Sequence, residues 1–172
     1  LILGKPLGVG ILSAALKQEK LSASGYRRMI EYTTQLNTPG VDLVEMPGVH
    51  ALTDVTGFGL AGHAAEVALA SEGVRLVFDA SALALLPGTA RLAQAGMLTG
   101  GGRRNREHLG RRLSLSPDVA AVLGEVVVDP HLAGGASPEQ GVPGRQLHRS
   151  TPEGDPAAQR WMIVGHARPE SP

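Results

Sequence analysis

The sequence contains no cysteine, which excludes disulfide bonds, thiolate metal sites and a thiol nucleophile within these residues. Aromatic residues make up only 3% of the chain, so a core must be built from Leu, Val, Ala and Ile. The 16 basic and 16 acidic residues cancel, so no whole-chain field attracts nucleic acid or anionic lipid. No apolar run reaches the ~18 residues of a membrane span. We therefore expect a cytoplasmic protein that binds neither nucleic acid nor membrane.

The length of 172 residues and the apolar content of 42% suit one domain with a hydrophobic core. The composition changes after Gly135, where prolines become frequent and large aliphatic residues scarce. Such a segment buries too little apolar surface to offset the entropy of ordering. We predict a folded domain over residues 1–135 and a divergent Pro-rich tail over 136–172, disordered apart from a last edge strand at 161–164. Because the sequence starts without Met inside an apolar run, we interpret it as a fragment.

Apolar periodicity predicts helices interleaved with strands, which is typical of a layered α/β domain. Helices are expected over 11–16, over 24–36 with Ser24 as N-cap, from Gly59 onward, and over 86–96. Pro117 at a first helical position predicts a short helix over 119–123. Strands are expected at 1–3, before Asp54, over 74–79 and over 125–129, and the glycines near residue 100 predict a loop over 98–105.

Residues 50–66, HALTDVTGFGLAGHAAE, are the one stretch whose chemistry can be argued from the residues. Asp54 ends a short apolar run, and Gly57 and Gly59 then allow positive φ and close backbone approach before a helix. A carboxylate, the Thr56 hydroxyl and the N–H groups of a helix start thus converge. Such a spot can hold Mg²⁺ and the phosphates it neutralises. An ordinary strand-turn-helix connection has the same pattern, so that alternative stays open.

DVTGFGLAGH resembles the corresponding element of selenophosphate synthetases. Three further blocks follow the order of that family: LILGKPLGVGIL, LPGTARLAQAGMLTGGGRRN and VVVDPHLAGG. The resemblance covers residues 1–135 and implies an α+β fold, a three-layer α/β/α domain like the carboxy-terminal domain of aminoimidazole-ribonucleotide synthetase. It also implies a homodimeric enzyme that converts selenide, ATP and water to selenophosphate, AMP and phosphate.

The resemblance assigns roles to four residues. Asp54 would be a Mg²⁺ ligand that helps to hold ATP, and Thr56 and Gly57 would shape the turn beside the phosphates. Asn105 matches an asparagine in the glycine-rich loop of the family. No residue of this chain is assigned a catalytic role.

For two other groups of residues, a structural role is favoured over ligand binding. His63 and Glu66 are spaced to share a metal ion, but a histidine satisfied by packing or water is favoured, because no second pair exists. The arginines between Arg103 and Arg112 can bind phosphate in bidentate fashion, although a solvated surface is favoured.

The sequence departs from the family in two places. The nucleophilic cysteine or selenocysteine, its neighbouring lysine, further metal-binding aspartates and a glycine-rich ATP loop belong to an amino-terminal domain that this sequence does not contain. The isolated chain is therefore expected to be inactive. In addition, DPHLAGG at 129–135 replaces approximately DPQTSGG.

Two alternative functions stay open. One is another Mg-ATP synthetase or kinase of the same superfamily, of the purine-pathway or hydrogenase-maturation type. The other is a non-catalytic remnant domain. Phe58 and His63 favour the selenium branch over its relatives, because they match the GFGLxGH signature of that branch.

Overall fold

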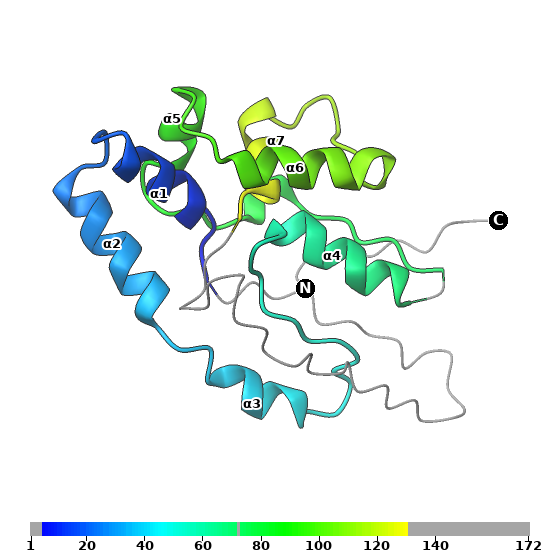
Figure 1. Cartoon of the computed structure of the whole chain (residues 1–172). Coiled ribbons are helices and arrows are strands. Elements are labelled where there is room, and N and C mark those ends of the chain that lie inside the picture. Colours follow the sequence, from blue (N-terminus) through cyan, green and yellow to red (C-terminus); the bar gives the residue numbers. More distant parts are fainter. Residues whose placement is uncertain (1–4, 72, 131–172) are drawn as a thin grey trace.

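The computed structural model describes residues 5–71 and 73–130. This part of the chain is helical (Figure 1), and its elements are connected by turns and irregular segments. The α-helices are α1 Val9–Lys17, α2 Ala23–Thr34, α3 Pro39–Val44, α4 Gly59–Leu69, α5 Thr89–Gln94, α6 Gly100–Leu109 and α7 Ala121–Val128, with 3₁₀ turns η1 Ala80–Ala82 and η2 Gly110–Arg112.

The helices predicted from apolar periodicity are present at α1, α2, α4 and α5. The predicted cap of α2 is wrong by two positions. Ser22, not Ser24, is the N-cap, and its Oγ accepts a hydrogen bond from the Gly25 amide at 3.1 Å. Ser22 lies outside the helix with extended backbone, which is the conformation that an N-cap requires.

The predicted strands within the described residues, at 51–54, 74–79 and 125–129, are wrong in this structure. β-pairing among the described residues is confined to one parallel bridge between Leu7 and Leu85. There, the Leu7 amide donates to Ala84 O at 2.8 Å and the Leu86 amide donates to Leu7 O at 2.9 Å. Residues 74–79 have no such ladder in this part of the chain, and an isolated segment is not stable as a strand. The sheet of the expected three-layer domain is therefore not seen in the described residues.

Besides α3, two segments form helices that the sequence does not predict. Residues 98–105 were expected to be a loop, but α6 begins at Gly100, after an N-cap at Thr99 whose Oγ1 accepts from the Gly102 amide at 3.0 Å. The β-branched run Val126–Val128 favours a strand by propensity, yet it completes α7. This helix packs against α4, α5 and α6, and its burial overrides the propensity.

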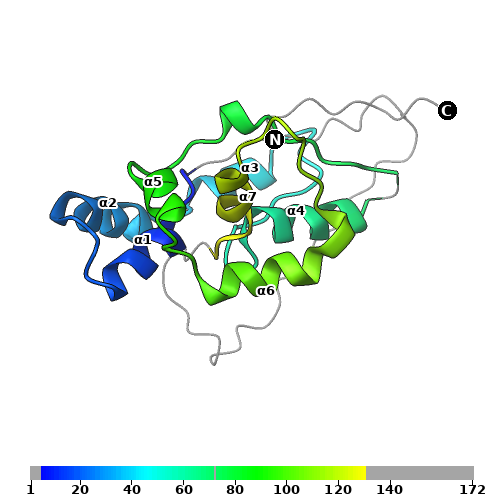
Figure 2. The ribbon, with the colours of Figure 1, turned by 90° about the horizontal axis from the view of Figure 1, so that it is seen from above.

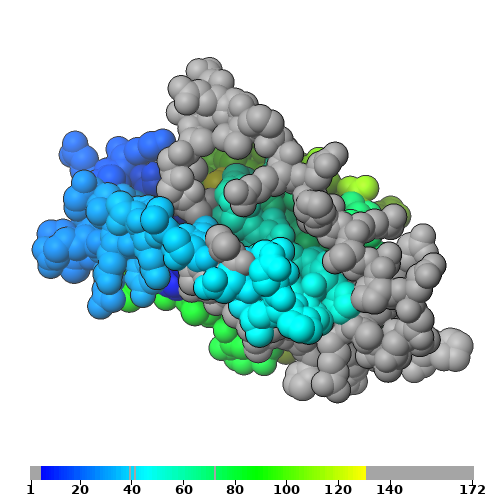
Figure 3. All heavy atoms as spheres, turned by 90° about the horizontal axis from the view of Figure 1, so that it is seen from below, coloured from blue at the N-terminus to red at the C-terminus, as the bar shows by residue number. Residues whose placement is uncertain are grey.

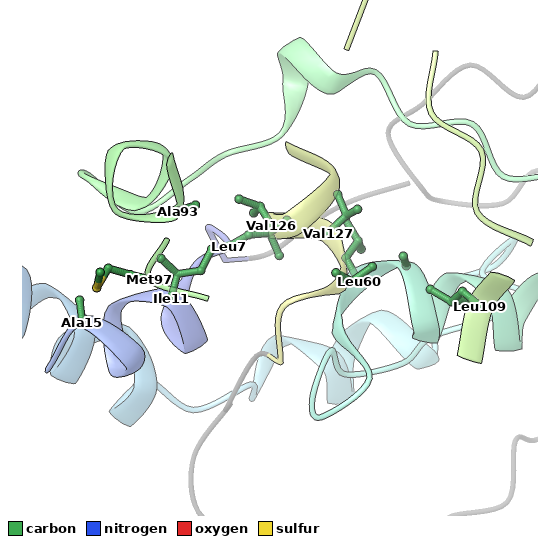
Figure 4. Close-up of a cluster of buried hydrophobic side chains, with 11 residues drawn as sticks. Leu7, Ile11, Ala15, Leu60, Ala93, Met97, Leu109, Val126 and Val127 are labelled. Atoms are coloured by element: carbon green, nitrogen blue, oxygen red, sulfur yellow. The ribbon is translucent and has the colours of Figure 1, made fainter. Parts of the chain in front are cut away.

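The hydrophobic core is centred on α7, which lies between α5 and α4 in Figure 2. Val126 and Val128 are almost fully buried there, beside Ile11 and Leu60. Figure 4 shows this cluster, to which α1, α4, α5, α6 and α7 all contribute. A second cluster joins α1 to α2 and consists of Val9, Leu12, Met29 and Leu86. The core is aliphatic, as the scarcity of aromatic residues requires.

α3 lies apart from this group of helices in Figure 1, and Figure 3 shows it, in cyan, on the surface seen from below. Two of the residues that end or follow it, Val44 and Met46, are exposed. The predicted strands at 1–3 and 161–164 and the predicted tail over 136–172 lie outside the described residues. No helix of the described part has both the length and the apolar character needed to cross a bilayer.

Asp129 joins the end of α7 to the starts of two other helices. Its carboxylate accepts hydrogen bonds from the Ile11 amide at 2.9 Å, from the Gly10 amide, and from Thr99 Oγ1 at 3.1 Å. The residue is only 5% exposed. Desolvation by burial raises the pKa of Asp129 from its ordinary 3.8 to about 6, although these hydrogen bonds act in the opposite direction.

We predict that Asp129 makes the chain less stable as pH rises from about 4 to about 6. The folded state keeps the proton in this range while the unfolded state releases it, so about 3 kcal/mol of the unfolding free energy is lost. Asp129→Asn should remove this loss, because an amide can accept from Ile11 and donate to Thr99 without titrating. Urea unfolding of both proteins at several pH values measures the difference.

Asp118 provides a control of opposite sign for that experiment. It is exposed, and the hydroxyl of Ser116 lowers its pKa. Asp118→Asn should therefore remove a stabilisation that is present at higher pH and lost as pH falls. A wild-type curve that runs parallel to that of Asp129→Asn between about pH 4 and 6 would contradict the assignment.

Candidate functional site

The turn before α4 carries three of the four residues assigned by the sequence: Asp54, Thr56 and Gly57. Gly59 ends the turn with a left-handed φ of 68°, and its amide donates to Thr56 O at 3.0 Å. A Cβ on Gly59 would lie 2.8 Å from the backbone carbon of Val128. A Cβ on Gly57 would meet no atom within 4 Å, so Gly59 alone needs both properties expected of the two glycines.

Asn105 fixes this turn to the end of α7. Its side-chain Nδ2 donates to Gly57 O at 2.9 Å and to Val128 O at 2.9 Å. Only 9% of the residue is exposed, so both hydrogens of the amide are used inside the protein. The structure thus brings together Asn105 and Gly57, which are 48 residues apart in the sequence.

Thr56, His63 and Glu66 form a chain of hydrogen bonds beside the turn. Thr56 Oγ1 lies 3.1 Å from His63 Nε2, and His63 Nδ1 lies 3.2 Å from Glu66 Oε2. His63 is 8% exposed and packs against the ring of Phe58, with centroids 5.7 Å apart. The favoured interpretation of His63 as a packed helix residue agrees with this burial. The sequence interpretation missed that it connects a hydroxyl to a carboxylate.

Asp54 is exposed, and its carboxylate makes no hydrogen bond or ion pair with any described residue. The described residues contain no group of three or more His, Cys, Asp or Glu side chains that could hold a metal ion by themselves. Mg²⁺ does not require such a cage, because one or two carboxylates with phosphate oxygens and water suffice. A carboxylate with no partner among the described residues, two positions along the chain from a hydroxyl, therefore fits Mg²⁺.

The starts of α1, α4 and α6 meet at residues 128–130. A Cβ on Gly10 would lie 2.5 Å from Asp129 Oδ1, and one on Gly101 would lie 2.5 Å from Pro130 Cγ. Gly10 of α1, Gly59 of α4 and Gly101 of α6 thus lie where the end of α7 approaches each helix. Sequence reasoning missed this role of Asp129, although three glycine-rich helix starts and one Asp-Pro pair were visible signals.

The three helix starts differ in which side chain, if any, accepts hydrogen bonds from their first amides. The Asp129 carboxylate occupies the first amides of α1, and Thr99 caps α6. At the start of α4 the N-cap is Phe58, which provides no side-chain hydrogen bond. α4 thus begins without a side-chain cap, while Gly59, Leu60 and Ala61 at its start are buried and the Gly59 amide already donates to Thr56 O.

A cavity of about 80 Å³ lies between α4 and α6. Its walls include Phe58, Glu66, His108 and Arg112. This volume is below the roughly 300–1,000 Å³ of typical small-molecule pockets, so a nucleotide does not fit into it. Arg106, one of the arginines considered for phosphate binding, instead pairs with Glu125 at 3.0 Å.

Comparison with known proteins gives one family and several close relatives. Residues 1–137 match the family described as AIR synthase related protein, C-terminal domain. The chain is 47% identical over 135 residues to the selenide, water dikinase of Pseudomonas straminea and 50% identical to that of Paraburkholderia xenovorans, covering 78% of this chain and 38% of each relative. The enzyme of Caldanaerobacter subterraneus is 38% identical over 135 residues, or 39% of its own length. The chain thus spans less than two fifths of these relatives.

Gly59→Ala should destabilise the chain more than Gly73→Ala does. Both glycines have a φ of 68°, so both variants carry the same left-handed strain. Only the Cβ at position 59 meets backbone atoms, whereas that at position 73 meets nothing within 4 Å. We expect Gly59→Ala to cost at least about 2 kcal/mol more in unfolding free energy, measured with urea. Equal losses in the two variants would show that the approach of α4 to Val128 is not tight.

Proposed function

The chain belongs to the family of AIR synthase related proteins through their C-terminal domain, and we propose that its parent protein is a selenide, water dikinase. The reaction uses selenide, ATP and water and yields selenophosphate, AMP and phosphate. Selenophosphate supplies activated selenium for selenocysteine and selenouridine. This chain contributes one side of the Mg-ATP site, and residues outside it complete the enzyme.

The exposed carboxylate of Asp54, which has no partner among the described residues, is the observation that carries this proposal. Phosphoryl transfer depends mostly on positioning and on neutralising charge at the phosphate oxygens. Mg²⁺, when bound, supplies that neutralisation. Asp54 would hold the ion by position and charge, and it does not act as a base.

The neighbouring residues hold the turn in place around Asp54. Asn105 anchors the Gly57 carbonyl, which leaves the backbone of the turn little freedom to move. α4 begins on the same turn without a side-chain cap, and the partial positive charge at a helix start favours a nearby phosphate group. Thr56 lies in the sequence between Asp54 and the start of α4 at Gly59.

The wider properties of the parent protein follow from the same proposal. We propose that residues 1–135 belong to a three-layer α/β/α domain. The parent is proposed to be a cytoplasmic homodimer that binds neither nucleic acid nor membrane. The absence of charge excess in the chain supports the exclusion of nucleic acid.

We predict that the 172-residue chain binds ATP weakly and only with Mg²⁺, and that Asp54→Ala abolishes this binding. The Asp54 carboxylate is the proposed Mg²⁺ ligand, so its loss removes the ion that joins protein and phosphate. Calorimetric titration of ATP with and without Mg²⁺ measures the effect, expected as at least about a tenfold loss of affinity.

Asp42→Ala is the matched control for this titration. Asp42 is an exposed aspartate on α3, outside the proposed site. Its variant should bind Mg-ATP like the wild type. Unchanged Mg-ATP binding in Asp54→Ala would remove Asp54 from the site and with it the observation that carries the proposal.

A further inference from the structure

The direction of the hydrogen bonds through His63 follows from the chemistry of its partners. Glu66 is a carboxylate, which can only accept, so His63 Nδ1 must carry the hydrogen of their 3.2 Å contact. In the neutral ring, Nε2 is then an acceptor. The Thr56 hydroxyl, 3.1 Å away, must therefore donate its one hydrogen to Nε2.

A hydroxyl that has given its hydrogen away can only accept further hydrogen bonds or bind a cation. We infer that the Glu66–His63 pair sets Thr56 Oγ1 as a ligand for a hard divalent cation, or for a water in its shell, and prevents it from donating to a phosphate. This inference rests on the proposed function and assigns Thr56 to the metal side of that site. His63 and Glu66 are positioning residues, since they act through Thr56.

Burial makes the arrangement specific. His63 is 8% exposed, so water does not compete freely for its ring nitrogens. α4 supplies both His63 and Glu66, and the helix spacing holds the carboxylate beside Nδ1. Glu66 itself is 58% exposed in its side chain, so it can be changed without leaving a buried gap.

The first test reads the position of the hydrogen on the ring. In ¹⁵N NMR spectra of the 172-residue chain at about pH 8.5, where an ordinary imidazole is neutral, His63 should carry its hydrogen on Nδ1. In Glu66→Gln the side-chain amide can donate as well as accept, so the Nε2–H form should become populated. A wild-type ring with its hydrogen on Nε2 would overturn the inference.

The second test compares a cation with an anion, using Mg²⁺ alone and inorganic triphosphate alone. Thr56→Val should weaken Mg²⁺ binding about fivefold or more, and Thr56→Ser should restore it, because serine keeps the hydroxyl. Glu66→Gln should also weaken Mg²⁺ binding and should strengthen triphosphate binding, since the hydroxyl becomes free to donate.

Glu66→Gln also removes a negative charge, and a double-mutant cycle separates that effect. In the Thr56→Val background, Glu66→Gln should produce only the small change due to charge. Glu107→Gln, an exposed glutamate on α6, gives the same change of charge away from the turn. An equal effect of Glu66→Gln with and without the Thr56 hydroxyl would overturn the inference.

The outcomes distinguish this inference from the proposed function. If Mg²⁺ binding depends on Asp54 but shows no coupling between Glu66 and Thr56, only the role of the pair is lost. If the wild type binds Mg²⁺ solely together with ATP, the cation preference of Thr56 is overturned while the proposed function stands. If Asp54→Ala leaves binding unchanged, the proposed function fails, although the NMR result can still hold.

Discussion

The close packing of three helix starts against residues 128–130 is the constraint on which the rest of the described structure depends. Glycines at positions 10, 59 and 101 leave no side chain where the end of α7 passes, and a methyl group at any of them would meet atoms at 2.5–2.8 Å. Asn105 and Asp129 then join the pieces through buried hydrogen bonds. The turn that carries Asp54 is thus positioned by residues outside it, because Asn105 bonds the Gly57 carbonyl and Val128 packs against Gly59.

Asn105 and Asp129, two of the buried polar side chains of the described part, perform complementary tasks. Asn105 is neutral and donates to two carbonyl oxygens, so its burial leaves no charge unpaired. Asp129 accepts from two amides and a hydroxyl, and burial still raises the pKa of its carboxyl group. Asp129 accepts from the Ile11 amide at the start of α1, and Asn105 donates to the Val128 carbonyl at the end of α7. Of the three helix starts, that of α4 is the one whose first amides donate to no side chain in the described part.

Local patterns in the sequence predict the helices whose starts are marked by glycine and followed by periodic apolar residues, namely α1 and α4. They fail for α6 and α7, where local and tertiary preferences conflict. Gly100–Gly102 indicate a loop, but Gly101 is small because Pro130 lies against it, and Gly102 lies against Thr99 and Asp129. Val126–Val128 indicate a strand, but the surrounding helices bury them instead. The family resemblance points to Asn105 and Gly57 separately but does not predict their hydrogen bond, and the bond from Ile11 to Asp129 spans 118 residues and has no local signal.

A shared anchor also determines where the chain can tolerate insertions and deletions during evolution. The connections over 70–79 and 113–120 lie between the helices that meet at residues 128–130, so added residues there leave the anchor in place. One residue added between Val128 and Pro130 would shift the surface against which α1, α4 and α6 all begin. Length variation in this domain should therefore be confined to those connections, while the short junction keeps a fixed number of residues.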